Sequence, residues 1–133
     1  MYYHYKSEEN FEAITEILQA FKSYGFYVVI NGGDVYVSEC IERFDSLDDI
    51  FDAVNQETVF SSIIWDEDRF GTQESAERKY FQEYLERVKR SGRDVYLLEY
   101  TTDEKVIKDI KDYCSEKGYK YYISSTLGLE VEK

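Results

Sequence analysis

The sequence predicts an α/β fold built on a parallel sheet. Four short apolar runs each end on a polar residue, and three of them follow a helix-like stretch that is closed by a glycine. The runs are 26–30 before Asn31, 51–54 before Asn55-Gln56-Glu57, 95–98 before Glu99, and 121–123 before Ser124. Strands that alternate with helices form parallel sheets. Ligands bind at the carboxyl ends of such strands, so the polar tips indicate where a site lies.

The N-terminal third is predicted to form a helix, a strand and a tight turn. The helix begins after Ser7, a good capping residue, and ends before Gly25. Its apolar residues recur at helical spacing: Phe11, Ile14, Ile17, Leu18 and Phe21. Residues 26–30 are almost all apolar, which indicates a strand covered on both faces. Residues 31–34, Asn-Gly-Gly-Asp, predict a tight turn at the tip of the strand, where the glycines let the backbone approach closely.

The middle of the chain is less regular. Residues 35–44 fit either a short helix or an irregular loop, and residues 46–49 form a turn into a second strand over 51–57. We expect residues 58–72 to be a long connection, which carries Trp65 and the acidic run 66–68. Loops of that length in a compact domain are usually functional or mobile.

The C-terminal half is predicted to contain two helices and two strands. The first helix covers 73–91, and its expected buried stripe is Ala76, Tyr80, Phe81, Tyr84, Leu85 and Val88. A strand follows over 95–99. Thr102 or Asp103 caps the next helix, Gly118 ends it, and the last strand covers 121–124. No linker is evident, so we expect a single domain over residues 1–133.

Composition narrows the classes of function. A net charge of -12 disfavours binding to nucleic acid and to anionic membranes, and no apolar run is long enough to span a bilayer. His4 is the only histidine, and Cys40 and Cys114 lack metal-ligand spacing, so we expect two buried thiols, no metal site and no cofactor. The acidic run 66–68 lacks the spacing of a calcium loop. The N-terminal residues carry no signal-peptide pattern, and the location stays open.

Glu57 and Glu99 are the candidate catalytic pair by position, because they end consecutive predicted strands. Two carboxylates that face one pocket suit glycoside hydrolysis. The alternative is that each one pairs with an arginine or lysine. Gln56 beside Glu57 favours a polar cleft. With Glu57 as the catalytic residue, Gln56 and Glu99 are expected to contact the substrate there.

The remaining candidates would bind substrate. Trp65 and Tyr100 could stack on sugar rings, as could Tyr2, Tyr3, Tyr5 and Tyr36. Asn31 and Asp34 flank the glycine turn, where Asn31 would bind sugar hydroxyls; a simple tight turn is the alternative. Ser124 ends the last predicted strand at the same rim.

Four ordered segments resemble a known enzyme family. They are 28–37 (VVINGGDVYV), 51–60 (FDAVNQETVF), 95–103 (VYLLEYTTD) and 118–125 (GYKYYISS). Together they resemble the endo-α-1,4-polygalactosaminidase-like glycoside hydrolases, family 114, which are (β/α)8 barrels that act on galactosamine-rich polysaccharide and are typically exported. The resemblance implies that the chain forms four parallel βα units, the C-terminal half of such a barrel. It also implies that Glu57 is a catalytic acid or base, and that the partner aspartate would precede the segment 2–5.

The resulting hypothesis is a half-barrel of a glycoside hydrolase that is inactive alone. Its substrate would be a carbohydrate, a cationic amino-sugar polymer that suits the acidic chain. We expect it to form a homo-oligomer or to associate with a complementing N-terminal half, because four strands cannot close a barrel. Two alternatives stay open: a non-catalytic carbohydrate-binding or interaction module, and an unrelated small flavodoxin-like domain.

Overall fold

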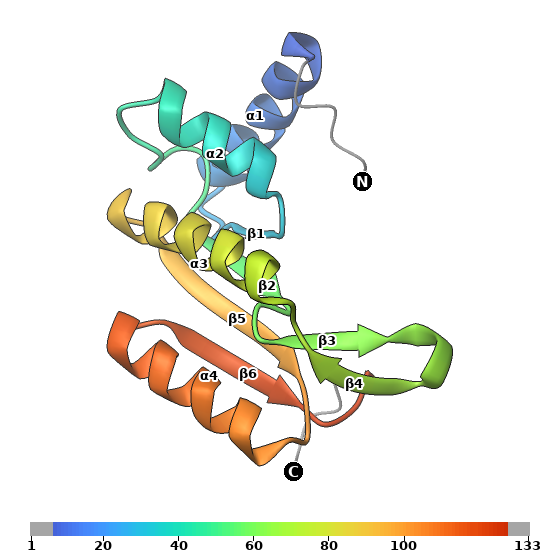
Figure 1. The fold of residues 1–133 in the computed structure, drawn as a ribbon. Coiled ribbons are helices and arrows are strands. Elements are labelled where there is room, and N and C mark those ends of the chain that lie inside the picture. The colour runs from blue at the N-terminus through green and yellow to red at the C-terminus, as the bar shows by residue number, and fades with distance from the viewer. Residues whose placement is uncertain (1–6, 128–133) are drawn as a thin grey trace. The chain divides into compact units, whose positions relative to one another are not determined.

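The computed structural model describes residues 7–127 (Figure 1). Its helices are α1 (Glu8–Ser23), α2 (Asp34–Arg43), the short 3₁₀ helix η1 (Trp65–Glu67), α3 (Ser75–Arg90) and α4 (Glu104–Lys117). Its strands are β1 (Val29–Asn31), β2 (Ala53–Glu57), β3 (Ser61–Ile64), β4 (Arg69–Thr72), β5 (Asp94–Tyr100) and β6 (Lys120–Ser124).

The four strands predicted from the sequence form one sheet in the order β1-β2-β5-β6. The β1–β2 and β5–β6 pairs are parallel, with Val29 opposite Ala53 and Tyr96 opposite Lys120. The order follows the chain, as in consecutive strands of a barrel. A flavodoxin-like sheet would instead have the order 2-1-3-4-5. The predicted α/β class with four parallel strands is therefore confirmed, and the flavodoxin-like alternative does not fit.

The chain divides into two compact units. The first comprises Met1–Asn55 and Tyr84–Asp94, and the second comprises Gln56–Glu83 and Val95–Lys133. The expectation of one domain over 1–133 stays a prediction.

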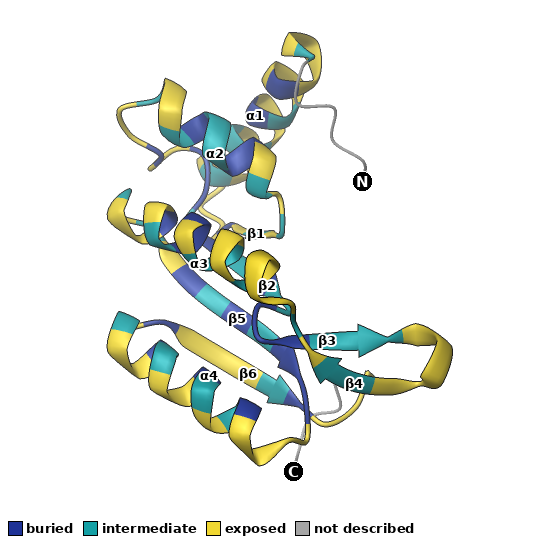
Figure 2. Ribbon diagram, viewed as in Figure 1, coloured by how far each residue is buried: buried dark blue, intermediate teal, exposed yellow. Residues whose placement is uncertain are grey.

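Helices α1 and α2 pack together through aromatic rings in the first unit. The predicted cap of α1 is confirmed, because the Ser7 hydroxyl accepts a hydrogen bond from the Asn10 amide at 3.3 Å. The ring of Phe11 lies 5.2 Å from that of Tyr36 on α2, and the Tyr36 and Thr15 hydroxyls are hydrogen bonded at 2.6 Å. Figure 2 shows the buried faces of both helices. Residues 35–44 were expected to form either a short helix or an irregular loop, and the structure shows the helix, α2.

The prediction of a first strand covered on both faces is wrong. Strand β1 covers only Val29–Asn31, and the exposed fractions of Phe26, Tyr27 and Val29 are 58%, 56% and 43%. Strand β1 lies at the end of the strand order, so only β2 pairs with it. An apolar run at a sheet edge resembles a buried central strand in sequence alone.

The predicted long connection over 58–72 contains two strands that we did not expect. Strands β3 and β4 form an antiparallel hairpin, with Ser61 opposite Thr72 and Ile64 opposite Arg69. A Cβ atom on Gly71 would lie 2.8 Å from the Ser62 hydroxyl oxygen and 3.0 Å from Ile64 Cδ1, so a larger residue there would require these two side chains to shift. The tip of the hairpin is η1, which ends at Asp68 in the left-handed conformation (φ 50°).

Helix α4 packs against β6 in the second unit. The Asp103 carboxylate caps it, by accepting from the Lys105 amide at 2.9 Å, and Gly118 ends it at φ 75°. Its buried residues are Val106, Ile110 and Cys114. Cys114 and, in the first unit, Cys40 are buried free thiols as predicted, and burial raises their pKa values to about 12 and about 11. In α3 the buried residues are Tyr84, Leu85 and Val88, whereas the expected Ala76 and Tyr80 are exposed.

Candidate functional site

Glu57 and Tyr100 are joined at the ends of β2 and β5 in the second unit. The Tyr100 hydroxyl donates a hydrogen bond to Glu57 Oε1 at 2.9 Å. Burial, together with this bond and the charge of Glu57, raises the pKa of Tyr100 to about 12. The phenol therefore stays protonated at neutral pH and donates to one carboxylate oxygen. The other oxygen, Oε2, has no hydrogen-bond partner among residues 7–127.

A cavity of about 610 Å³ lies beside this pair. Its lining residues are Glu57, Thr58, Ser62, Ile63, Trp65, Gln73, Tyr100 and Leu127. Glu57 is the single carboxylate among these described lining residues. The side chain of Trp65 is 72% exposed at the tip of the hairpin. A carboxylate with one free oxygen, next to an exposed indole, can transfer a proton to or from a sugar ligand.

The residue after Glu57 has a strained backbone. Thr58 has φ 54°, which is unusual for a β-branched residue. Hydrogen bonds hold it on both sides: its amide donates to the Leu98 carbonyl at 3.0 Å, and its carbonyl accepts from Gln73 Nε2 at 3.0 Å. Backbone strain of this kind is found preferentially at functional sites, where it fixes a side chain in place.

Glu99 is buried and holds the turn that follows Glu57, which differs from the substrate contact we expected. Its side chain is 0% exposed. Its carboxylate accepts from the amides of Val59 at 3.1 Å, Phe60 at 3.2 Å and Ser61 at 3.1 Å, and from the Ser61 hydroxyl at 2.8 Å. Burial raises the pKa of Glu99, although these hydrogen bonds partly oppose the effect. Glu99 therefore positions the chain around Glu57 and does not line the cavity.

Gln56 and Ser124, two further expected binding residues, also lie inside the protein. Gln56 is 8% exposed. Its Nε2 donates to the Glu57 carbonyl at 3.2 Å, and its buried Oε1 has no partner in the described part of the chain. Ser124 is 3% exposed, and its hydroxyl bonds the Thr126 carbonyl and accepts from the Thr126 amide. Neither side chain lines the cavity.

Asn31 and Asp34 belong to the first unit. Asn31 is exposed at the end of β1, where its Oδ1 accepts from Asn55 Nδ2 at 2.9 Å. The Gly32 amide, next in the chain, donates to the Asn55 carbonyl at 2.8 Å. Asp34 is the first residue of α2 and is half-buried. Sugar binding by these two residues stays a prediction.

The remaining candidate site residues either lie outside the described residues or do not line the Glu57 cavity. His4, Tyr2, Tyr3 and Tyr5 lie outside the described residues. Tyr36, an expected stacking residue, is 4% exposed and packs in the first unit. Within residues 7–127, no group of three or more histidine, cysteine or acidic side chains could hold a metal ion. None of the described helices is long and apolar enough to cross a membrane.

Sequence reasoning missed the residues that support Glu57. Ser61, Gln73 and Thr58 carry no motif, and their roles depend on a turn that brings them to β5. We expected Trp65 to lie in a long connection. In the structure Trp65 lies in η1 at the tip of the β3–β4 hairpin and lines the cavity. Asp68 carried one sequence signal of the turn at the hairpin tip. It has φ 50°, and Asp adopts this left-handed conformation more readily than most non-glycine residues.

Comparisons with known proteins support a likeness in fold. No protein-family model matches the chain, and no curated protein sequence matches it. Among solved structures, the glycoside hydrolase domain of PelA from Pseudomonas aeruginosa matches with a TM-score of 0.69 and 17% identity. A variant of the same domain with a glutamate-to-alanine substitution matches with a TM-score of 0.68 and 16% identity. Each match covers 93% of this chain and 47% of the PelA chain. The chain thus has the fold of about half of a glycoside hydrolase domain, and the expected likeness to half of a barrel is confirmed at that level.

Proposed function

We propose that the chain is half of a glycoside hydrolase site and that Glu57 is its catalytic carboxylate. The main support is the position of Glu57: at the carboxyl end of a parallel strand, in a cavity of about 610 Å³, with one oxygen held by Tyr100. The fold likeness to a glycoside hydrolase domain supports the same reaction class. Glu57 would act as the acid or base at a glycosidic bond.

The described site supplies one of the two carboxylates that this chemistry needs. Glycoside hydrolases use a pair of carboxyl groups about 5–9.5 Å apart. Glu99, the neighbouring carboxylate in the sheet, has its oxygens occupied by three amides and a hydroxyl. Glu99 is thus not that second carboxylate, and in this proposal a complementing half supplies it, so that the chain alone is inactive.

The proposed substrate is an α-1,4-linked galactosamine polymer. This choice rests on the family resemblance of the four sequence segments and on charge. A polymer with free amino groups is cationic, and the chain carries a net charge of -12. No cofactor is needed for this reaction.

A second half-barrel is the proposed partner. By register, Tyr96, Leu98, Lys120 and Tyr122 share one face of the β5–β6 pair, and Tyr122 is 45% exposed. Parallel strands are normally covered on both faces. A second copy of the chain or a complementing half would cover this face. Sedimentation equilibrium measures this association. We expect a mass above that of one chain, or a complex that forms when a complementing half is added. Tyr122→Glu should weaken either association.

Turnover of galactosamine oligomers tests the catalytic proposal. The monomeric chain should release no product. The completed assembly should cleave the oligomer, and Glu57→Gln should abolish the cleavage, whereas Glu83→Gln on the exposed side of α3 should not. Cleavage by the completed assembly that persists in Glu57→Gln would contradict the proposal.

The exposed indole of Trp65 favours one alternative, a carbohydrate-binding module without catalysis. Stacking on an exposed aromatic ring binds sugars without a second carboxylate. In that case Trp65→Ala should abolish oligomer binding, while Glu57→Gln leaves binding unchanged and no assembly cleaves the oligomer.

A further inference from the structure

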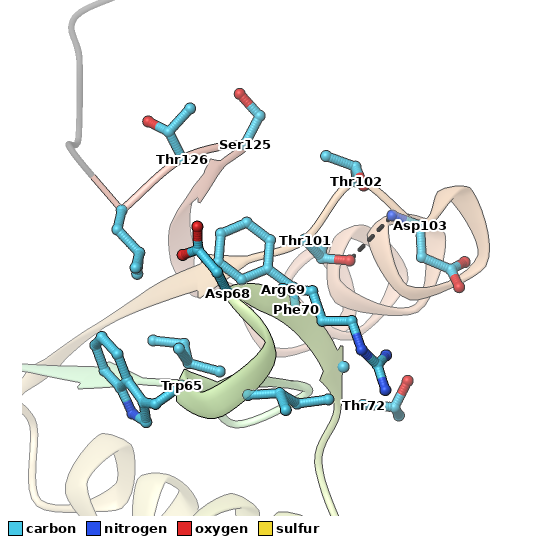
Figure 3. A pocket seen from close by; sticks show the side chains of 14 residues that line it. Trp65, Asp68, Arg69, Phe70, Thr72, Thr101, Thr102, Asp103, Ser125 and Thr126 are labelled. Atoms are coloured by element: carbon cyan, nitrogen blue, oxygen red, sulfur yellow. Dashed lines mark hydrogen bonds between the residues drawn. The ribbon is translucent and has the colours of Figure 1, made fainter.

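A second cavity, of about 500 Å³, adjoins the Glu57 cavity in the second unit. The β3–β4 hairpin and the loops after β5 and β6 form its walls (Figure 3). Ile63, Trp65 and Leu127 line both cavities. A cavity of this volume lies within the range of small-molecule sites, about 300–1,000 Å³. One oligomeric ligand could therefore occupy both hollows.

The walls of this second cavity combine ring faces with hydroxyl groups. Phe70 and Trp65 supply the aromatic side chains. Its hydroxyl-bearing residues are Thr72, Thr101, Thr102, Ser125 and Thr126. Side chains of these two kinds suit a sugar ring, which has apolar faces and a hydroxyl-bearing edge.

The charges in the cavity are not balanced. The Arg69 guanidinium pairs with Glu67 at 2.8 Å, so its charge is already compensated. Asp103 uses Oδ1 to cap α4. Asp68 has no hydrogen-bond or ion-pair partner for its carboxylate among the described residues. In Figure 3 the Asp68 carboxylate and the Arg69 guanidinium point in opposite directions. The cavity therefore presents an uncompensated carboxylate.

We propose that this cavity is a second sugar subsite, in which the Asp68 carboxylate binds the ammonium group of an unacetylated amino sugar. The inference rests on the proposed function, because it takes the same polymer as ligand. Ring faces and hydroxyl groups would bind any hexose, whereas the carboxylate distinguishes a free amine from an N-acetyl group. A carboxylate–ammonium hydrogen bond is stronger than a neutral one, so Asp68 would set the selectivity for unacetylated polymer.

Calorimetric titration with two ligands tests this subsite. The ligands are an α-1,4-galactosamine oligomer and the same oligomer fully N-acetylated. We expect Asp68→Asn to weaken binding of the unacetylated oligomer about tenfold and to leave binding of the acetylated one unchanged. Asp66→Asn is the matched control, because Asp66 lies on the same turn, is exposed and lines neither cavity. It should change neither affinity.

The outcomes separate this proposal from the catalytic one. Binding of both oligomers that Asp68→Asn weakens equally, or does not weaken, would overturn the subsite. If Asp68→Asn had no selective effect but Tyr100→Phe weakened binding, the Glu57 cavity would remain a binding site without the proposed subsite. Binding needs no cleavage, so a selective effect of Asp68→Asn would hold even if no assembly hydrolysed the oligomer. Failure of the wild-type chain to bind either oligomer would overturn the subsite, whereas the catalytic proposal is decided by cleavage in the completed assembly and its loss in Glu57→Gln.

Discussion

Tyr100 holds Glu57 through a hydrogen bond of 2.9 Å from its hydroxyl to the carboxylate. The bond joins the end of β5 to the end of β2 within the second unit. It leaves one Glu57 oxygen without a partner among the described residues, at a cavity bordered by Trp65. The position of the candidate catalytic group therefore depends on a residue 43 positions later in the chain.

The first prediction concerns the ionisation of Tyr100. In the wild-type chain we expect a pKa of about 12, caused first by burial and then by Glu57. Because the folded pKa lies above the ordinary value of 10.0, the folded state loses stability as the pH rises from about 10 to about 12. Glu57→Gln should lower the Tyr100 pKa without restoring it fully, since burial remains.

Carbon-detected NMR of labelled tyrosine can follow that titration residue by residue. The signal of Tyr24, which is 78% exposed and lies in the first unit, is the internal control, and its chemical shift at neutral pH should be the same in both proteins. An unchanged Tyr100 pKa in Glu57→Gln would contradict the hydrogen bond.

The second prediction concerns Glu99 as a positioning residue. Glu99→Gln replaces one acceptor oxygen by a donor that faces backbone amides, so it should lower the free energy of unfolding by about 3 kcal/mol. Glu116→Gln, on the exposed side of α4, should change it by less than about 0.5 kcal/mol. Urea denaturation of each variant measures the change in the free energy of unfolding.

A second readout separates positioning from stability alone. If Glu99 holds the turn after Glu57, the Tyr100 pKa should fall in folded Glu99→Gln below its wild-type value. A folded Glu99→Gln protein with the wild-type Tyr100 pKa would show that Glu99 does not position Glu57.

The third prediction concerns the backbone strain at Thr58. A φ of 54° costs a β-branched residue free energy that glycine does not pay. Thr58→Gly should therefore raise the free energy of unfolding by about 0.5–1 kcal/mol. Thr72→Gly, in strand β4 at an ordinary negative φ, should lower it by about 1 kcal/mol. Equal losses in the two variants would contradict the strain at Thr58.

The fourth prediction concerns acid stability in the first unit. Lys22 Nζ lies 2.7 Å from Asp52 Oδ1, and the Val28 amide donates to Asp52 Oδ2 at 2.7 Å. Burial acts to raise the pKa of Asp52, but the Lys22 hydrogen bond, the Val28 amide and nearby positive charges outweigh it, so the pKa is lowered.

A lowered pKa stabilises the folded state above the ordinary value of 3.8, and this contribution is lost as the pH falls through the folded pKa. Asp52→Asn should cost about 1–2 kcal/mol near neutral pH and remove part of the acid dependence. The exposed Asp45→Asn is the control. The same pH dependence in wild type and Asp52→Asn would rule out this role.

Local patterns predicted most of the elements. Ser7 and Asp103 cap helices as expected, because capping depends only on the next few residues. The hairpin over residues 61–72 was missed, since its first strand, Ser61–Ile64, does not alternate polar and apolar residues. The edge position of β1 was missed because pairing order is not encoded in an apolar run.

The candidate site was predicted only in part. Glu57, Tyr100 and Trp65 come together at one cavity, which follows from their places at strand ends and in the connection between strands. Glu99 ends a strand in the same way, yet it is buried by the turn at residues 59–61. That turn folds onto a strand about 40 positions later in the chain, and no local pattern predicts such a contact.

The most direct test of the central claim is product release from an α-1,4-galactosamine oligomer, measured with the chain at a mass verified by sedimentation. We predict that the monomer binds the oligomer without cleaving it, and that cleavage appears only in an assembly with a second half-barrel and is lost in Glu57→Gln. Cleavage by the monomer that Glu57→Gln abolishes would contradict the need for a second carboxylate. Cleavage that survives Glu57→Gln would contradict the assignment of the site itself.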